Sequence, residues 1–309
     1  MLRNPREEFG QALLALAKED ERVWALDADL STSTMSTYIE KNIPDRFVEA
    51  GIAEANMVGI GAGLALSGKI PFCNSFAIFM TGRTYDQIRQ SLCIPKLSVK
   101  ICGSSAGLSD YGDGSTHQTI EDIALMRVLP NMVVVSPGDG RQTAEAVRAI
   151  AAYDGPAYLR VTRSEMPDLP GDEPFVIGKV YPVVDGNDLT IFATGIMVSR
   201  ALDAAEILRS EGINICVVNV PSIKPLDVSA IQALAAKTGK VLTCEEHSVI
   251  GGLGSAIAEA LRKSGIKMDI MGIEDMFGQS ANCEADLTEY YKLRPCDIAD
   301  RIRTALKEL

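Results

Sequence analysis

Residues 112–118, with the sequence GDGSTHQ, place a carboxylate, two hydroxyls, an imidazole and an amide in one short stretch. The stretch holds one of only two histidines in the chain. Asp113 and His117 are close enough in sequence to bind substrate hydroxyls or to move a proton between them. The alternative is structural: Ser115 or Thr116 caps a helix that begins just after the stretch. Taken alone, the stretch leaves both interpretations open.

Glu54 is a second candidate, because it is the only acid in the small, apolar run 53–67. Burying an ionisable group in such surroundings is costly unless the group is paired. A carboxyl in a dry pocket can give and take a proton, as acid–base chemistry requires. The competing interpretation is that Glu54 lies in the first turn of a helix and complements the helix dipole. The sequence favours neither.

Two further sets of residues stand where side chains could meet a ligand. Phe76 and Phe79 are three residues apart and follow a predicted strand. Such a pair is more typical of a core than of a ligand platform. Asp29 lies in the hydroxyl-rich loop 27–34, which the sequence places directly after another strand.

Alternating strands and helices must position these groups. Apolar runs and helical spacing predict strands and helices in turn from the N-terminus to Arg163, which is typical of a parallel, doubly wound sheet. In such sheets polar groups gather at the carboxyl ends of the strands. The predicted helices are 5–18, 53–67, 83–92, 119–129 and 141–152, and the predicted strands are 23–26, 70–76, 97–102, 132–135 and 156–162.

A proline- and acid-rich segment, 164–174, divides the chain. We therefore predict a first domain at 1–165, a linker at 166–178 and a second α/β domain at 179–309. The second domain repeats the alternation, so the predicted fold class is α/β with two doubly wound domains. Its predicted strands are 189–193, 213–220, 240–244 and 267–273, and its predicted helices are 198–210, 228–236, 255–263 and 297–309. His247 follows a predicted strand there, and we interpret it as a hydrogen-bonded loop histidine.

Composition excludes several classes of protein. A net charge of -11 argues against nucleic acid or an anionic membrane as a main partner. The 309 residues contain 47% hydrophobic side chains, ample for a sizeable core, but no stretch long enough to span a membrane. Seven scattered cysteines without a C-x-x-C pair, after a charged N-terminus, indicate a cytoplasmic protein with reduced thiols and no zinc site.

Several stretches together make the chain resemble the C-terminal half of a transketolase, in the form where two polypeptides share the enzyme. The resemblance covers essentially the whole sequence. It predicts a pyrimidine-binding domain for thiamine diphosphate, followed by a transketolase C-terminal domain. The stretches that carry it are 51–57 (GIAEANM), Phe76 with Phe79, 112–118 (GDGSTHQ), 129–132 (LPNM) and 245–254 (EEHSVIGGLG).

The resemblance implies roles on the cofactor side of the site. Glu54 matches the catalytic glutamate that hydrogen-bonds the aminopyrimidine ring nitrogen and thereby helps the thiazolium carbon to lose its proton. Phe76 and Phe79 match aromatics that pack on the aminopyrimidine. Asp29 matches an aspartate near the thiazolium.

The resemblance also implies roles on the sugar side. His117, which is also a catalytic candidate, and Asp113 match groups that hold sugar hydroxyls. Arg6, Ser33 and Arg163 align with positions that bind the phosphate of the sugar tail. The chain departs from the family pattern at two places on this side: Ser105 stands where a histidine is frequent, and Asp110-Tyr111 replaces small or apolar residues. We therefore expect a non-standard sugar substrate.

The resemblance implies a partner chain as well. The Gly-Asp-Gly triplets at 112–114 and 138–140 lack an asparagine at the spacing of the magnesium-diphosphate motif, since Asn131 is too near and Asn187 too far. We therefore predict no metal site in this chain. Magnesium and diphosphate ligands would come from an N-terminal transketolase subunit in an α2β2 assembly, acting on a sugar phosphate or related anionic sugar.

Three other functions compete with this interpretation. The β subunit of a 2-oxo acid dehydrogenase has the same two domains and the same catalytic glutamate, but the Thr-His-Gln motif speaks against it. A 1-deoxyxylulose-phosphate-synthase-like enzyme shares the motif, usually on one longer chain. A non-catalytic scaffolding paralogue would have no use for Glu54, Asp113 and His117 together.

Overall fold

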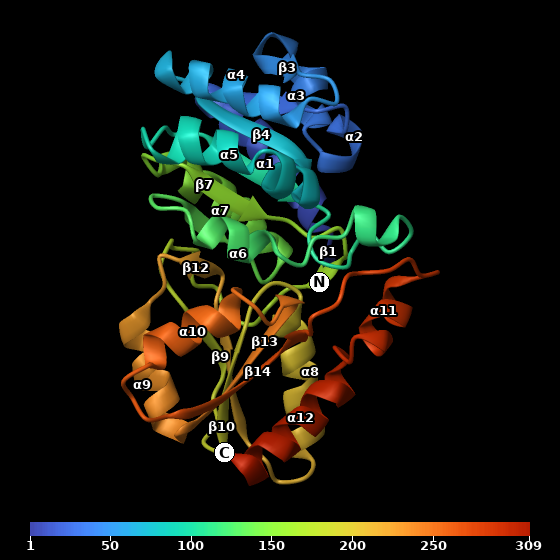
Figure 1. Ribbon diagram of the computed structural model, residues 1–309, viewed down its shortest axis with the longest axis vertical. Coiled ribbons are helices and arrows are strands. Elements are labelled where there is room, and N and C mark those ends of the chain that lie inside the picture. Colours follow the sequence, from blue (N-terminus) through green and yellow to red (C-terminus); the bar gives the residue numbers. More distant parts are fainter.

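The computed structural model describes residues 1–309 as two α/β units stacked along the long axis of the molecule (Figure 1). The first sheet has seven strands in the order β12-β6-β7-β5-β4-β2-β3, and the second has five in the order β14-β13-β10-β11-β9. Most neighbouring strands in both sheets are parallel. The predicted α/β fold class is confirmed.

The first unit has a helical layer on each face of its sheet. Phe9 of α1 and Val147 of α7 belong to the apolar cluster on one face. Met57 of α4 and Ile123 of α6 belong to the cluster on the other. Its elements are β1 (Leu2–Arg3), α1 (Pro5–Glu19), β2 (Val23–Asp27), α2 (Ser31–Thr34), α3 (Thr37–Asn42), η1 (Pro44–Arg46), β3 (Phe47–Glu49), α4 (Glu54–Leu66), β4 (Ile70–Phe76), η2 (Phe79–Arg83), α5 (Tyr85–Gln87), η3 (Ile88–Cys93), β5 (Lys100–Ser104), η4 (Gly114–Thr116), α6 (Asp122–Arg127), β6 (Val133–Val135), α7 (Gly140–Ala152), β7 (Ala157–Arg160) and β8 (Met166–Pro167).

The second unit repeats this layering around a sheet of five strands, of which the sequence predicts all but β9. Helices α8 and α12 pack together on one face of its sheet, and α9 and α10 contact each other and β13. Its elements are β9 (Tyr181–Val184), β10 (Leu189–Ala193), α8 (Met197–Arg209), β11 (Ile215–Asn219), β12 (Ser222–Lys224), α9 (Val228–Thr238), β13 (Lys240–Ser248), α10 (Leu253–Leu261), β14 (Lys267–Ile273), α11 (Glu284–Tyr290) and α12 (Pro295–Glu308).

Some predicted elements are wrong in extent. The helix predicted over 119–129 begins only at Asp122, because Gly107 and Thr119 exchange backbone hydrogen bonds in a short antiparallel bridge. The helix predicted over 83–92 lies in a run that also contains two π-helical turns, η2 and η3. The loop predicted at 27–34 contains α2.

The two units are joined by more than the segment between them. Strand β12 follows the second unit's β11 in sequence, yet it pairs antiparallel with β6 at the edge of the first sheet. Strand β8, at the start of the predicted linker, pairs with β1, so this part of the predicted linker belongs to the first unit. One apolar cluster also runs through both units, from Val134 of β6 to Phe192 of β10. The domain division at 166–178 therefore remains a prediction. In the structure the two units share a sheet edge and an apolar cluster.

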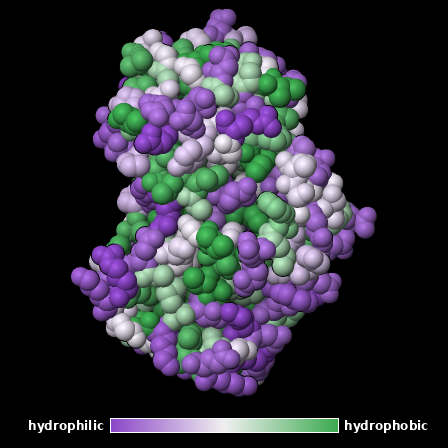
Figure 2. Space-filling model, viewed as in Figure 1, coloured by the Kyte–Doolittle hydropathy of each residue, from purple (hydrophilic) through white to green (hydrophobic).

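A hollow of about 620 Å³ lies between the units, lined by residues of α6, β12, α9 and α10. Figure 2 shows the molecule narrowed at the junction of the two units, with hydrophobic and hydrophilic residues mixed on this face. None of the predicted site residues lines the hollow. The predicted site therefore has to be sought elsewhere, at the carboxyl ends of the first sheet's strands.

Candidate active site

Two phenylalanines and a histidine form an aromatic cluster after β4. Phe76 ends that strand and Phe79 begins the π-helical turn η2, so the turn brings the two rings together. Their centroids are 6.0 Å apart and their planes 19° apart. His117 meets Phe79 edge-on at 5.3 Å and Phe76 at 6.1 Å. The three residues thus form an aromatic platform with an imidazole at its edge.

Glu54 lies beside this platform, linked to it by Arg83. The carboxylate is only 3% exposed and stands at the first residue of α4. Arg83 Nη1 donates to both of its oxygens, at 3.1 and 3.3 Å. The same guanidinium lies over the Phe79 ring, 4.3 Å from its centroid. Glu54 therefore satisfies both interpretations, because it is a buried carboxyl and also lies in the first turn of a helix.

Asp29 lies at the same edge of the sheet but contacts neither the platform nor Glu54. It is exposed, has a φ of 62°, and its N–H donates to Glu49 Oε1 at 2.9 Å. The buried carboxylate of this loop is Asp27, which accepts from the hydroxyls of Thr34 and Ser36 at 2.7 and 2.8 Å. Burial raises the pKa of Asp27 to about 6, against these hydrogen bonds, which lower it.

Two arginines and a carboxylate lie near the loop that carries His117. Arg163 Nη1 lies 3.2 Å from Asp110 Oδ2, and Arg6 Nη1 donates to the backbone oxygen of Ser33 at 3.0 Å. Burial and the nearby charge of Arg163 lower the pKa of Arg6. Burial raises the pKa of Asp110, and nearby Asp113 adds to that rise, whereas Arg163 and His117 oppose it. These couplings bring the predicted tail-binding and sugar-binding residues into one region, since charges interact appreciably only at short range.

The motif 112–118 makes a loop rather than a helix cap. Its only helical turn is η4, and α6 begins after Glu121 with no side-chain cap. The capping interpretation of Ser115 and Thr116 is therefore wrong. Thr116 Oγ1 lies 2.9 Å from His117 Nδ1, and Asp113 is exposed. The loop leaves the acid and the imidazole available to a ligand.

Three buried hydroxyls lie at the carboxyl ends of β4 and β5 without a hydrogen-bond partner in the chain: Ser75, Ser104 and Ser105. Ser105 is fully buried and has a φ of 53°, in the left-handed region that side chains rarely adopt. Buried polar groups are normally paired. These orphaned hydroxyls therefore indicate that a bound group or another chain completes this end of the sheet.

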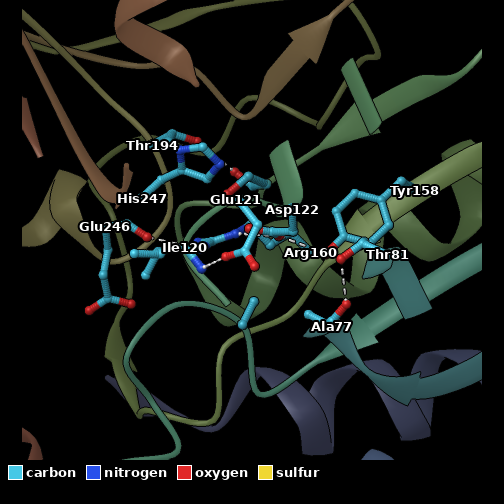
Figure 3. Close-up of polar contacts among 12 residues, drawn as sticks. Ala77, Thr81, Ile120, Glu121, Asp122, Tyr158, Arg160, Thr194, Glu246 and His247 are labelled. Carbon is cyan, nitrogen blue, oxygen red and sulfur yellow. Dashed lines mark hydrogen bonds and ion pairs between the residues drawn. The ribbon is translucent and has the colours of Figure 1, made fainter. Parts of the chain in front are cut away.

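A second polar cluster, next to the site, joins the two units (Figure 3). The buried Asp122 accepts from Arg160 Nε at 2.8 Å and from Tyr158 at 2.7 Å. Arg160 Nη2 in turn donates to the backbone oxygen of Glu246 on β13. The Glu246 carboxylate accepts from the N–H of Leu108, in the loop after β5. The second unit thereby holds the loop that leads to Asp110.

His247 belongs to β13, so its predicted place in a loop is wrong. Its ring is fully buried: Nε2 accepts from the N–H of Ala124 at 3.3 Å, and Nδ1 lies 2.7 Å from the oxygen of Ser248. These contacts require a neutral ring with its proton on Nδ1. His247 is thus a structural residue with both nitrogens engaged.

Comparison with known proteins identifies this architecture. The model of the transketolase pyrimidine-binding domain matches residues 4–168, and that of the transketolase C-terminal domain matches residues 178–298. The chain belongs to the transketolase family. Within that family it corresponds to a C-terminal subunit.

Its relatives include chains of similar length. The 6-deoxy-6-sulfo-D-fructose transketolase subunit SqwH of Clostridium sp. (strain MSTE9) is 43% identical over 93% of this chain and 88% of its own. An apulose-4-phosphate transketolase subunit of Phocaeicola vulgatus is 41% identical over 87% of each chain. A solved structure described as a split-gene transketolase in an inactive β4 tetramer is 44% identical over 98% of each chain, with a TM-score of 0.91.

Membership in this family implies a transferase that depends on thiamine diphosphate. The residues present fit the aminopyrimidine part of that cofactor, because the Phe76–Phe79 pair offers an aromatic face and Glu54 a buried carboxylate beside it. The orphaned hydroxyls of Ser75 and Ser104 lie at the same strand ends. No helix of the chain has the length and apolar character to cross a membrane.

Two residues that the structure places in the site have no role predicted from the sequence. Arg83 stands four residues after Phe79, a spacing that brings side chains together on a helix and could have indicated the contact. Asp110 stands out in the sequence only as a departure from the family pattern. Its pairing with Arg163 joins two loops 53 positions apart in the chain, so no local signal reveals it.

Proposed function

We propose that this chain is the C-terminal subunit of a two-chain transketolase that transfers a two-carbon ketol unit to an aldose. The donor is a ketose with a phosphate or similar anionic tail. The observation that carries the proposal is the aromatic platform with Glu54 on one side and the Arg6–Arg163 pair on the other. Retention of both halves of such a site favours catalysis over a scaffolding role.

On the cofactor side, each residue has a distinct task in this proposal. Thiamine diphosphate supplies, when bound, the carbon nucleophile that attacks the ketose carbonyl. Glu54 hydrogen-bonds the aminopyrimidine ring nitrogen, a role supported by its burial beside the Phe76–Phe79 pair. Phe76 and Phe79 cover the face of the ring and exclude water. Arg83 orients the Glu54 carboxylate through its two hydrogen bonds. Asp29 lies near the thiazolium, as the resemblance implies.

On the sugar side, His117 and Asp113 orient substrate hydroxyls, and His117 moves a proton at a hydroxyl oxygen. The edge-on contact of the imidazole with Phe79 supports this role. Arg6 and Arg163, with Ser33, bind the oxyanion of the tail, for which guanidinium geometry is well suited. Ser105 lines the region where many transketolases carry a histidine.

A partner subunit completes the site in this proposal. The chain lacks the diphosphate motif, so the magnesium and diphosphate ligands come from an N-terminal transketolase subunit, and the active form is α2β2. The inactive β4 state described for the related split-gene transketolase supports the same dependence here. Alone, this chain would associate with itself and remain inactive.

Reconstitution tests the proposal. The chain is assayed alone and after coexpression with an N-terminal transketolase subunit from the same genome, with thiamine diphosphate and magnesium. Ketol transfer to aldoses should require both chains and both cofactors. Full transfer by this chain alone would contradict the two-chain proposal. Transfer to a lipoyl domain, or condensation of pyruvate with an aldose, in place of ketol transfer would move the chain to one of the competing enzyme classes.

A further inference from the structure

The tail-binding side of the site contains a carboxylate that opposes an anion. Asp110 is only 3% exposed and is ion-paired with Arg163. Its backbone oxygen accepts from the N–H of Gly114 and from Gln118 Nε2, at 3.3 and 3.2 Å. These backbone bonds fix the main chain of Asp110 to the loop that carries His117, and the ion pair holds its side chain beside Arg163.

Arg6 is the other cation available to the tail. Its Nη1 is bonded to the backbone oxygen of Ser33, while its buried Nε has no partner within the chain. Among the charges that act on Arg6 are Arg163 and Glu7, and the Asp110 carboxylate acts on it in the opposite sense to Arg163. An unpartnered buried N–H beside a second guanidinium indicates an incoming oxygen acceptor.

Charge balance then limits what the tail can be. Two guanidiniums and one buried carboxylate leave at most a single positive charge, because the partly buried Glu7 also acts on Arg6 and Ser105 adds no charge. A phosphate ester carries about 1.5 to 2 negative charges at neutral pH. A sulfonate or a carboxylate carries one, which the site neutralises without leaving a surplus. Once the tail is bound and removed from water, such a surplus is costly.

On the strength of the proposed function, we propose that Asp110 is a specificity-determining residue and that the site takes sugars with a monoanionic tail, a sulfonate or a carboxylate, in preference to phosphate esters. Asp110 lowers the positive charge that Arg163 presents to the tail. The Asp110 carboxylate repels each negative charge of the tail. A dianionic tail therefore meets about twice the repulsion that a monoanionic tail meets. An uncharged tail leaves the arginine charge unsatisfied.

The test compares tails on one carbon skeleton. The two-chain enzyme is given substrates that end in sulfonate, carboxylate, phosphate or hydroxyl, and kcat/KM is measured for wild type, Asp110→Asn and Asp269→Asn. Asp269 is also a carboxylate paired with an arginine, Arg301, but lies in the second unit. Calorimetric titration of the same compounds into the complex gives binding affinities independently of turnover.

Wild type should favour the sulfonate or carboxylate over the phosphate, and Asp110→Asn should shift the ratio toward phosphate by about tenfold or more. Asp269→Asn should leave the ratio unchanged. If Asp110 served folding alone, Asp110→Asn would lower kcat/KM for all four substrates by the same factor. A wild-type preference for phosphate or hydroxyl, or an unchanged ratio in Asp110→Asn, would overturn the inference. If the complex binds these compounds with the predicted ratios but turns none over, the inference stands and the proposed function fails.

Discussion

Asp27 shows how a single buried group makes the stability of this chain depend on pH. Its carboxylate is fully buried and its pKa is raised from 3.8 to about 6 by burial. Between these two values the folded state binds more protons than the unfolded state. Stability therefore falls as pH rises through this window and is regained as pH falls.

Asp27→Asn removes this titration. Relative to the variant, wild type should gain about 1 kcal/mol in unfolding free energy between pH 7 and pH 5, and about 3 kcal/mol in all at still lower pH. Urea unfolding of both proteins at the two pH values measures the difference, and other groups cancel in the comparison. A difference that does not change with pH would show that Asp27 is ionised in the folded state throughout this range.

At the level of single residues, the sequence identified side chains that the structure brings together. It did not predict which of them contact each other. The aromatic residues and Glu54 lie side by side, in keeping with the roles that the resemblance implies. Sequence could not decide whether Phe76 and Phe79 form core or platform, because that depends on His117 arriving from a distant loop. It also could not show Arg83 as the partner of Glu54, because the π-helical turn η2 sets that geometry.

Helix α4 presents two very different faces. Gly61 faces the sheet, where an added Cβ would lie 2.8 Å from Cys73 Sγ. Gly59 and Gly63 face outward, and an added Cβ there would meet nothing within 4 Å. Leu66, on the same outward side by helical spacing, and Ile52, just before the helix, are each 75% exposed. This outward face is the close-packing surface that we expect a partner subunit to cover.

Substitutions on the two faces should have opposite effects. Gly63→Leu should preserve or slightly raise the thermal stability of the isolated chain, since glycine disfavours a helix by about 1 kcal/mol. It should weaken subunit assembly at least tenfold. The matched variant Gly61→Leu should instead lower the melting temperature, because the side chain has no room. Thermal melts and analytical ultracentrifugation measure the two effects, and normal assembly of Gly63→Leu would exclude this face as the interface.

At the element scale, the predictable parts were those with a strong local pattern. Strands β4, β10 and β14 begin and end where their apolar runs predict. Strand β12 has only three residues between prolines and no pattern of its own. It pairs with a strand far away in sequence, so tertiary packing alone defines it. The start of α6 was missed for the same reason, since the Gly107–Thr119 bridge is a long-range contact.

At the scale of the whole molecule, the buried cluster around Arg160 ties the units together. Arg160 is 7% exposed and Asp122 is fully buried. Strand β12 and the shared apolar cluster add to this connection. The two units should therefore unfold as one, in a single calorimetric transition.

Arg160→Met leaves the Asp122 carboxylate buried without its cation, at a cost of about 3 to 5 kcal/mol. A large drop in melting temperature should follow, and the double variant with Asp122→Asn should recover part of it. The control is Arg303→Met, whose pairs with Glu211 and Asp300 are partly exposed, with an expected change within about 1 kcal/mol. Equal effects of Arg160→Met and Arg303→Met would show that the cluster does not hold the units together.

Calorimetric titration of thiamine diphosphate with magnesium into three samples tests the proposed function at its centre. The samples are the chain alone, the chain with its N-terminal partner, and the pair carrying Glu54→Gln. We predict tight binding only by the pair, and a Glu54→Gln pair that still binds the cofactor but loses at least a hundredfold in ketol transfer. Tight binding by the chain alone, or full activity of the Glu54→Gln pair, would contradict the claim that this chain supplies Glu54 to a site completed by another subunit.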